Sequence, residues 1–229
     1  MTDNKKGGMD VTSEEIARYI DHTNLRPMAT KKDIELLCAE ALRYRFAAVC
    51  VNPFRVQLAA LLLKGSGIKV ASVVGFPLGA TFPEVKALEA KNALENGAEE
   101  IDMVINIGAL KDGDDDLVLK DIEAVTSAAS GATVKVILEC CYLTKEEKIR
   151  ACRLSSEARA NFVKTSTGFG SGGATLEDIK LLRANVPASM GVKAAGGIRD
   201  FKTAHVFIKA GATRIGTSSG PQIMSTCPA

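Results

Sequence analysis

The chain has 229 residues, of which 46% are hydrophobic, and it carries a formal net charge of +2 at pH 7. This length and composition are typical of one soluble α/β domain with a large buried core. The small net charge disfavours a nucleic-acid or membrane partner. An aromatic content of 5% without tryptophan also disfavours a platform for stacking bases.

The first residues and the cysteines indicate where the protein works. Met1 to Gly8 is polar and leads into no apolar segment, so we expect no signal peptide and assign residues 1–10 to a flexible N-terminal tail. No apolar run reaches transmembrane length. Six cysteines are present without a Cys-x-x-Cys pair, so we expect reduced core thiols in a cytoplasmic protein and no zinc.

Short β-rich runs alternate with helical patterns along the rest of the chain, which predicts parallel βαβ units. In chain order, the eight predicted strands are Arg18–Asp21, Ala47–Val51, Lys69–Val74, Glu100–Asn106, Thr133–Glu139, Asn161–Thr165, Gly191–Ala194 and Thr213–Gly216. Eight strands with helices between them, and no long linker, predict a single-domain (β/α)8 TIM barrel over residues 11–229. In such barrels the chemistry lies at the carboxyl ends of the strands.

Helix starts can be recognised in several of the gaps. A threonine followed three residues later by an acidic residue has the pattern of a capping box, and this occurs in Thr30 with Asp33, Thr144 with Glu147 and Thr175 with Asp178. Asp200 can cap a further helix. The short stretch after Ser219 predicts an eighth helix of two turns at most.

Lys164 lies near the end of an apolar strand, just before the glycine-rich turn Gly168–Gly173. A lysine that is partly stripped of water is disfavoured in its charged form, and a neutral amine can attack a carbonyl to form a Schiff base. The turn can point backbone N–H groups at a phosphate. The alternative is a solvated lysine at the rim of the barrel, followed by an ordinary loop.

The alternation of side chains along strands points two more charged residues into the barrel. Asp102 lies between apolar residues that would face the helices, so we expect it to point inward, and the same argument applies to Lys193. A second ammonium group near Lys164 would lower its pKa further. Asp102 could pair with Lys193 and also move protons. The alternative is a purely structural ion pair between Lys193 and Asp102.

Other polar residues lie at predicted strand ends. Asp21 and Thr23 could join a proton relay there. A lone histidine more often makes a local hydrogen bond than it joins a proton relay, and we expect this for His22. His205 falls on the apolar stripe of a helix, where we expect it to pack against neighbouring residues. Glu139 could hydrogen-bond near the site or stabilise a loop.

Three glycine-rich segments could bind phosphate at one end of the barrel. They are Gly168–Gly173, Gly196-Gly197 and Gly216–Gly220. Helix N-termini and bare amides favour anions, and TIM barrels often bind phosphate in the loops after strands seven and eight. Each segment alone is a weak signal, but three that converge on one quadrant of a barrel predict a phosphate site.

Together these residues resemble the deoxyribose-phosphate aldolases, a family of class I aldolases of deoxynucleoside breakdown. The resemblance covers nearly the whole chain, in Ile20-Asp21-His22-Thr23, Val49-Cys50-Val51-Asn52-Pro53, Val74-Gly75-Phe76-Pro77-Leu78-Gly79, Glu100-Ile101-Asp102-Met103-Val104-Ile105-Asn106, Lys164-Thr165-Ser166-Thr167-Gly168-Phe169, Val192-Lys193-Ala194-Ala195-Gly196-Gly197-Ile198-Arg199 and Arg214-Ile215-Gly216-Thr217-Ser218-Ser219. Two departures are Asn24, where the family usually has an apolar residue, and Cys140, where threonine is expected.

The resemblance implies a barrel that reversibly cleaves 2-deoxy-D-ribose 5-phosphate to D-glyceraldehyde 3-phosphate and acetaldehyde, with no metal or other cofactor. It implies that Lys164 forms the Schiff base, that Lys193 lowers the pKa of Lys164 and shares in proton transfer, and that Asp102 activates water and moves protons. It also implies that the substrate phosphate binds at Gly168, Gly196, Gly197, Ser218 and Ser219.

Two other functions fit parts of the pattern. One alternative is another Schiff-base aldolase of phosphosugars, either transaldolase-like or acting on keto-deoxy sugars. Such enzymes usually depend on one lysine, so the pairing of Lys164 with Lys193 disfavours this alternative. A catalytically silent sugar-phosphate-binding protein would lack one of Lys164, Lys193 or Asp102, and all three are present. We therefore expect a small phosphorylated sugar as partner, no nucleic acid or membrane, and a homo-oligomer, either dimer or tetramer.

Overall fold

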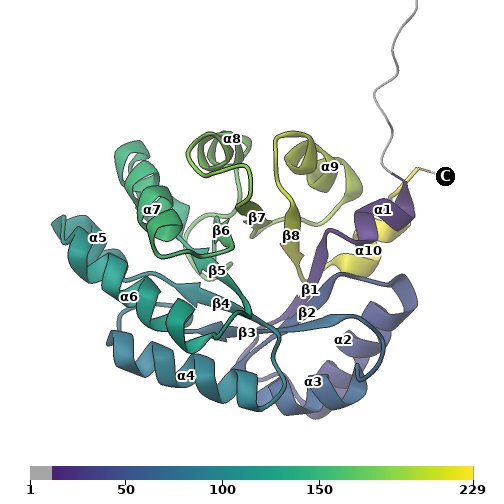
Figure 1. The fold of residues 1–229 in the computed structure, drawn as a ribbon. Helices are drawn as coiled ribbons and strands as arrows, with labels where there is room; N and C mark the ends of the chain where they lie inside the picture. Colours follow the sequence, from purple (N-terminus) through teal and green to yellow (C-terminus); the bar gives the residue numbers. More distant parts are fainter. Residues whose placement is uncertain (1–11, 229) are drawn as a thin grey trace, which may run out of the picture.

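A computed structural model of the chain describes residues 12–228, and these residues form one closed barrel of parallel strands (Figure 1). The strands are β1 (Ile20–Asn24), β2 (Ala48–Val51), β3 (Lys69–Val74), β4 (Glu100–Val104), β5 (Thr133–Ile137), β6 (Phe162–Lys164), β7 (Gly191–Ala195) and β8 (Arg214–Thr217). Each strand pairs with the next, and β8 pairs with β1 to close the sheet. The predicted (β/α)8 barrel is confirmed, whereas the predicted tail at residues 1–10 lies outside the described residues.

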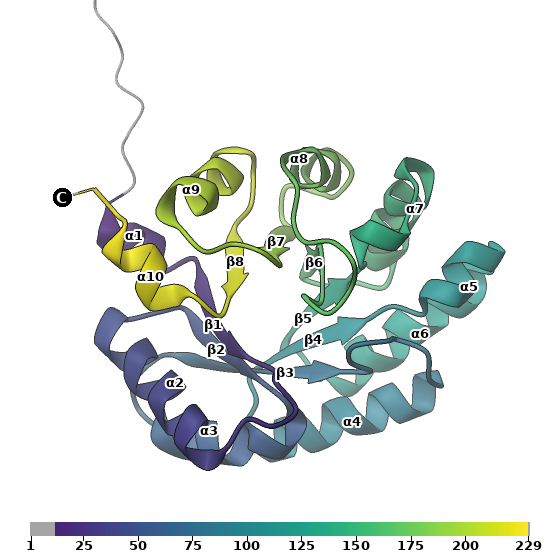
Figure 2. The same ribbon diagram turned by 180° about the vertical axis from the view of Figure 1, so that it is seen from behind.

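Helices surround the strands, and the view from behind shows the same ring (Figure 2). They are α1 (Ser13–Ala17), α2 (Lys31–Tyr44), η1 (Pro53–Arg55), α3 (Val56–Leu62), α4 (Pro83–Glu95), α5 (Ile107–Asp112), α6 (Asp115–Ala128), η2 (Cys140–Tyr142), α7 (Lys145–Glu157), α8 (Leu176–Ala184), α9 (Phe201–Lys209) and α10 (Gly220–Ser225). The first and last of these, α1 and α10, lie side by side next to β1.

Several strand ends differ from the prediction for local reasons. β1 begins at Ile20 because Arg18 still belongs to the end of α1, where its N–H donates to carbonyls of that helix. β4 ends before Asn106 because the Asn106 side chain caps α5. β5 ends before Glu139, which adopts a left-handed conformation with φ of 55°.

The main hydrophobic core lies between the barrel and its helices. Alternate strand residues such as Ile101, Met103 and Val192 are fully buried in this apolar cluster. Burying each large apolar side chain contributes about 1.5–3 kcal/mol relative to exposure. The intervening residues of the same strands point to the barrel axis, where Asp102 and Lys193 are also fully buried.

The helices mostly begin where the caps were predicted. Complete capping boxes occur at α2 and α7, formed by Thr30 with Asp33 and by Thr144 with Glu147. The third predicted box is incomplete. Thr175 accepts the Asp178 N–H and caps α8, but the Asp178 carboxylate binds the Thr175 hydroxyl at 2.8 Å and not its backbone N–H. Asp200 caps α9 as expected.

The last helix is short, as predicted, and rests directly on the barrel. Ile223 of α10 is fully buried in the core. At Gly220, a Cβ atom would come within 2.8 Å of the Phe46 ring, so glycine permits this close approach.

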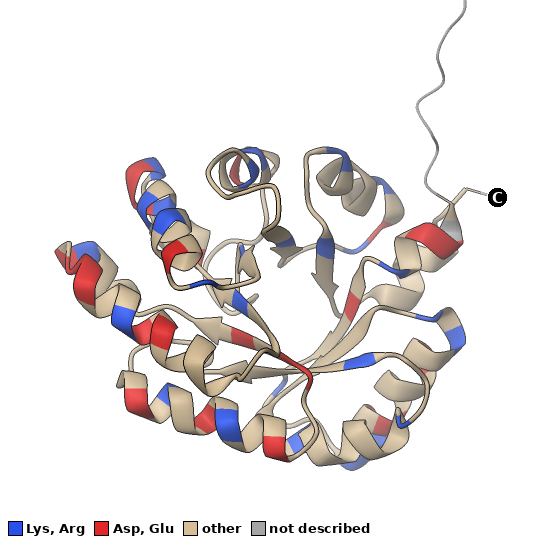
Figure 3. Ribbon diagram, in the orientation of Figure 1, with Lys and Arg blue, Asp and Glu red and all other residues tan. Residues whose placement is uncertain are grey.

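Charged side chains of both signs are mixed over the outer helices (Figure 3). Within residues 12–228, no helix combines the length and the apolar character needed to cross a bilayer.

Candidate active site

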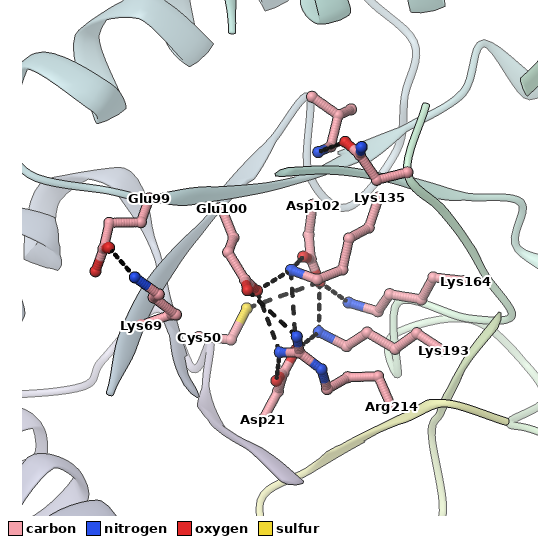
Figure 4. Close-up of polar contacts among 12 residues, drawn as sticks. Asp21, Cys50, Lys69, Glu99, Glu100, Asp102, Lys135, Lys164, Lys193 and Arg214 are labelled. Atoms are coloured by element: carbon pink, nitrogen blue, oxygen red, sulfur yellow. Dashed lines mark hydrogen bonds and ion pairs between the residues drawn. The ribbon is translucent and has the colours of Figure 1, made fainter. Parts of the chain in front are cut away.

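Seven charged side chains meet inside the barrel (Figure 4). They are Asp21 from β1, Glu100 and Asp102 from β4, Lys135 from β5, Lys164 from β6, Lys193 from β7 and Arg214 from β8. Four of these residues, Asp21, Asp102, Lys135 and Lys193, have no solvent exposure. Because buried charges are costly unless they are paired, the contacts among these groups define the site.

Asp102 is the centre of this charged cluster. Its Oδ2 accepts hydrogen bonds from Lys164 Nζ at 2.7 Å and from Lys193 Nζ at 2.8 Å. Its Oδ1 accepts one from Lys135 Nζ at 2.8 Å. The register places Lys164 directly beside Lys193 on neighbouring strands. The predicted inward orientation of Asp102 and Lys193, and the pairing between them, are confirmed.

Asp21 contacts Lys193 from the other side. Asp21 Oδ2 lies 2.5 Å from Lys193 Nζ, and Asp21 Oδ1 accepts a hydrogen bond from Arg214 at 2.6 Å. Lys193 therefore bridges two buried aspartates. The hydroxyl of Thr23, the other residue predicted for a relay, donates to the backbone carbonyl of Asp21 at 2.9 Å, and Thr23 lines the cavity above.

Three members of the cluster were missed by the sequence analysis. Lys135 Nζ lies 2.5 Å from Glu100 Oε2, and the Arg214 guanidinium donates to both carboxylate oxygens of Glu100 at 3.3 Å. Lys135 could have been found, because it lies between two valines in β5, as Lys193 lies between two apolar residues. Glu100 and Arg214 lie at the amino ends of their strands, where the barrel rule predicts no chemistry.

Burial and pairing together set the charges of the cluster. Burial raises the pKa of Asp102, but the three lysines around it outweigh burial and hold this pKa well below its ordinary value. Burial also raises the pKa of Asp21, but Lys193, Lys135 and Arg214 bring it down to about 2. Both carboxylates are therefore ionised at neutral pH.

The cations respond in the opposite sense. Burial lowers the pKa of Lys193, but Asp102 and Asp21 outweigh it, and the net shift is upward. Lys135 also has a raised pKa, because Asp102 and other carboxylates outweigh its burial. Both lysines therefore carry a positive charge at neutral pH. The thiol of Cys50, 4.0 Å from Asp102 Oδ2, is neutral, because burial raises its pKa to about 11.

A cavity of about 540 Å³ opens above the cluster, at the carboxyl ends of the strands. Lys164 lines this cavity, with 3% of its side chain exposed. Lys193 and Lys135 are fully buried and do not line it. A molecule in the cavity can therefore reach Lys164 first among the three lysines.

The glycine-rich segments meet at the same cavity, whose lining includes Gly168, Gly196, Gly197 and Ser218. Gly196 has a φ of +93°, and a Cβ at this position would lie 2.9 Å from the Cα of Gly173. The loops after β6 and β7 therefore touch backbone to backbone, which only glycine permits. The expected convergence of three segments on one quadrant is confirmed.

Ser219 is placed differently from the other residues predicted to bind phosphate. It is the residue before α10, and it does not line the cavity. Its backbone N–H donates to Thr217 Oγ1 at 2.9 Å. A role for Ser219 in phosphate binding stays a prediction.

The remaining strand-end residues support the walls of the site. His22 Nε2 lies 2.7 Å from Glu40 Oε2, the local partner expected for this histidine. Glu139 accepts hydrogen bonds from both the backbone N–H, at 3.1 Å, and the hydroxyl of Thr167. It therefore fixes the segment that follows Lys164. His205 stacks on an aromatic ring of its own helix, as expected for packing.

The site combines an amine that reaches the cavity, an ammonium group beside it, a carboxylate that touches both, and amide-rich loops. In the part of the chain that the structure describes, no group of three or more His, Cys, Asp and Glu side chains is suited to hold a metal ion. An amine that lines a cavity, beside a fixed cation and a carboxylate, suits covalent chemistry on a carbonyl compound. The glycine loops suit an anionic group on the same compound.

Comparison with known proteins shows the family to which the chain belongs. A model described as DeoC/LacD family aldolase matches residues 16–226. A deoxyribose-phosphate aldolase of Thermococcus gammatolerans is 64% identical over 221 residues, which covers 95% of this chain and 96% of the relative. A deoxyribose-phosphate aldolase of a Geobacillus species is 61% identical over 210 residues, which covers 91% of this chain and 94% of the relative. A tetrameric deoxyribose-phosphate aldolase of Aeropyrum pernix superposes with a TM-score of 0.88 at 36% identity, over 93% of this chain and 91% of its own.

Proposed function

The chain belongs to the DeoC/LacD aldolase family, and on this premise we propose that it is a deoxyribose-phosphate aldolase, a class I lyase. It reversibly cleaves 2-deoxy-D-ribose 5-phosphate to D-glyceraldehyde 3-phosphate and acetaldehyde through a Schiff base on Lys164. One observation carries the assignment of the nucleophile. Of the three lysines in the buried cluster, Lys164 is the one that lines the cavity, and it also contacts Asp102.

The charge balance of the cluster supports Lys164 as the amine that reacts. The cluster holds four basic groups, Lys135, Lys164, Lys193 and Arg214, and three carboxylates, Asp21, Glu100 and Asp102. One basic group can therefore lose its proton and leave the cluster neutral. We propose that this group is Lys164, because it is the one of the four that lines the cavity.

The first half of the reaction forms the imine. The neutral amine of Lys164 attacks the C1 aldehyde of the open-chain sugar and forms a carbinolamine. Lys193 passes a proton to the C1 hydroxyl, which leaves as water. The product is a protonated imine between Lys164 and C1, which serves as the electron sink for the next step.

The second half breaks the C2–C3 bond. The C3 hydroxyl gives up its proton to Lys193, which became neutral in the first half of the reaction, and the electrons of the C2–C3 bond move toward the imine nitrogen. C3 becomes the aldehyde carbon of D-glyceraldehyde 3-phosphate, and Lys164 retains an enamine. A proton returned to C2 restores the imine, and the water that hydrolyses it balances the water lost earlier. We propose that Asp102 positions and deprotonates this water, with Lys193 completing the proton path.

We propose that the substrate phosphate binds at the wall of the cavity that the glycine-rich loops form. Gly168, Gly196, Gly197 and Ser218 line the cavity, and we propose that their amide and hydroxyl groups hold the phosphate, together with Ser219 beyond the lining. Binding energy from the phosphate orients C1 toward Lys164, which is the usual benefit of holding a non-reacting group.

We further propose that the enzyme works in the cytoplasm, in deoxyribonucleotide breakdown. All six cysteines are free thiols, which suits a reducing compartment.

The assembly we propose is a homo-oligomer that uses an apolar patch on one side of the ring. The patch comprises Phe54 of η1, Leu61 of α3, Leu78 and Phe82 before α4, and Val85 and Leu88 of α4. η1 contacts α4, and α3 and α4 lie side by side in both ribbon views. Phe54 and Phe82 expose 85% and 74% of their surface. The six side chains together expose on the order of 700 Å², close to the ~800 Å² per partner of a stable interface, and a second copy of this chain supplies the same apolar patch.

The proposed reaction is tested by product analysis. Purified protein is incubated with 2-deoxy-D-ribose 5-phosphate, and acetaldehyde and D-glyceraldehyde 3-phosphate are quantified by coupled dehydrogenases. Equal amounts of both products support the proposal. Cleavage of keto-deoxy sugar phosphates, without cleavage of 2-deoxyribose 5-phosphate, would favour the other class of Schiff-base aldolase.

A further inference from the structure

A second buried ion pair lies outside the charged cluster, on the helix side of the barrel. Lys86 Nζ of α4 lies 2.6 Å from Asp121 Oδ2 of α6, and neither side chain has any solvent exposure. The proposed reaction does not use either residue. A fully buried pair at this position therefore needs an account of its own.

The pair binds the backbone at the end of β4. Lys86 Nζ donates to the carbonyl of Val104 at 2.8 Å, and Asp121 Oδ2 accepts the N–H of Asn106 at 3.1 Å. These two backbone groups lie just beyond Asp102, where regular strand pairing ends. The carboxyl end of β4 is thus held by side chains of two helices as well as by its neighbouring strands.

Lys86 also supports the loop after β3. A Cβ at Gly75 would lie 2.9 Å from Lys86 Cε, so the lysine stem fills the space beneath this glycine. The neighbouring Glu89 accepts the Gly75 N–H at 2.7 Å. Further along the loop, a Cβ at Gly79 would lie 1.9 Å from the carbonyl oxygen of Ile105. The loop and the end of β4 therefore form one tightly packed unit above α4.

This unit reaches the wall of the cavity. Phe76, the residue after Gly75, meets Phe169 edge to face, with ring centroids 5.3 Å apart. Phe169 lines the cavity that Lys164 also lines. The ion pair is thus connected to the site indirectly in two ways. One connection runs through the strand that carries Asp102, and the other runs through the aromatic contact at the cavity wall.

Stability alone is a poor reason for such a pair. Replacing a buried ion pair by apolar residues of similar volume is often neutral or stabilising, whereas removing one partner is strongly destabilising. Burial here lowers the pKa of Lys86 and raises that of Asp121, and their mutual attraction does not reverse either shift. Asp121 Oδ1 is buried without a hydrogen-bond partner. The pair is therefore costly, and its value lies in where it holds the backbone.

We propose that Lys86 and Asp121 are positioning residues for the aldolase reaction, which clamp the end of β4 so that the Asp102 carboxylate keeps contact with both Lys164 and Lys193. This inference rests on the proposed function. Asp102 meets the two amines at 2.7 and 2.8 Å, and misplacement of a catalytic group by about 1 Å can cost roughly 100-fold in rate.

The test uses the double variant Lys86→Met with Asp121→Leu, which removes both charges and keeps the volume apolar. We expect a folded protein whose midpoint of urea unfolding lies below that of the wild type, because the Val104 carbonyl and the Asn106 N–H lose these side-chain partners. We expect kcat for 2-deoxyribose 5-phosphate to fall by at least about tenfold, while KM changes by less than about threefold because the phosphate wall is untouched. The rate of borohydride-trapped imine formation with acetaldehyde should fall in parallel.

A matched control removes an ion pair that holds no strand end. Lys148 Nζ lies 2.6 Å from Asp178 Oδ1 and joins α7 to α8. The variant Lys148→Met with Asp178→Asn should keep kcat within about twofold of the wild type. If the Lys86 and Asp121 single variants fail to fold, the double variant still decides the question.

The outcomes separate the two proposals. A folded double variant with wild-type kcat, beside an active wild type, would overturn the clamp and leave the proposed function intact. A wild type that does not cleave 2-deoxyribose 5-phosphate would overturn both. A lowered kcat in a folded double variant, with an unaffected control, supports the clamp.

Discussion

Replacing Lys193 by methionine removes the cation that joins the two buried aspartates. Lys193 Nζ lies 2.5 Å from Asp21 and 2.8 Å from Asp102. Methionine keeps much of the lysine stem, so the change deletes the charge with little loss of packing. The cluster then holds three basic groups and three carboxylates in place of four and three.

The expected cost in stability follows from the partners that remain. Breaking a buried ion pair by removing one partner typically costs about 3–5 kcal/mol. Here Asp21 retains Arg214 at 2.6 Å, and Asp102 retains Lys135 and Lys164, so neither carboxylate is left alone. We therefore expect a loss near the lower limit, about 3 kcal/mol, in the free energy of unfolding by urea.

The pH of this measurement follows from the direction of the shift. The folded-state pKa of Lys193 is raised above the ordinary value of 10.5. Its contribution to stability is therefore fully present below pH 10.5 and is lost as the pH rises through the folded-state pKa. The full difference between variant and wild type should appear at pH 7.

The effect on catalysis should be larger than the effect on folding. Without Lys193, the cluster loses the ammonium group that we propose passes protons to and from the substrate. We expect kcat/KM at pH 7 to fall by roughly 10²–10⁴-fold. The assay measures initial rates of acetaldehyde release between pH 6 and 10.

Lys69→Met is the matched control. Lys69 also lies on a strand, but its partner Glu99 is at the surface, and both side chains are about half exposed. Such a pair contributes about 0–1 kcal/mol, so the control should keep its activity and pH profile. If Lys193→Met retained wild-type activity, Lys193 would be a structural cation only, and its proposed role in proton transfer would be refuted.

Three further predictions concern the phosphate wall, acid stability and assembly. Gly196→Ala should raise KM for 2-deoxyribose 5-phosphate more than KM for 2-deoxyribose, because a φ of +93° and the contact with Gly173 force the loop to shift. Steady-state kinetics that show equal changes in KM for both sugars would exclude a role of this loop in phosphate binding. The free energy of unfolding should fall as the pH drops from 3.8, the ordinary pKa of aspartate, toward about 2, the folded-state pKa of Asp21. This loss amounts to about 2 kcal/mol for that group. A free energy of unfolding, measured by urea titration, that stays constant across this range would contradict the buried pairing. Phe82→Asp, which puts a charge into the exposed apolar patch, should shift the mass in sedimentation equilibrium toward that of a monomer of 24.2 kDa, and an unchanged mass would place the interface elsewhere.

Side-chain alternation predicted much of the site from the sequence. In β4 and β7 the apolar neighbours of Asp102 and Lys193 pack against the helices, and the two charged residues therefore point inward, where they meet. The face on which each residue lies is strongly specified, because a one-residue slip of a strand would exchange its two faces.

Other features depend on relations between strands that one strand cannot reveal. Register sets Lys164 beside Lys193 and Asp102 beside Lys135, and it is fixed only when the barrel closes. A single strand also cannot show that Lys164 lines the cavity while Lys193 does not. The polar groups at the amino ends of the strands, such as Glu100, could not be assigned by a rule that looks only at the carboxyl ends.

The buried pair of Lys86 and Asp121 was invisible in the sequence for a different reason. Both residues lie on the outer helices of the barrel, where a charged residue is normally read as solvent-facing. They are separated by 35 positions, and besides each other they bind backbone groups of Val104 and Asn106. Only the packing of α4 against α6 brings them together.

The most direct test of the central claim is mass spectrometry of the intact protein after borohydride reduction in the presence of 2-deoxy-D-ribose 5-phosphate, followed by peptide mapping. Imine chemistry predicts a stable adduct on Lys164 in the wild type. It also predicts a folded but inactive Lys164→Arg variant without an adduct. A wild-type protein that releases acetaldehyde without a trapped adduct, or an adduct that maps to Lys193 or Lys135, would contradict the assignment of Lys164 as the nucleophile.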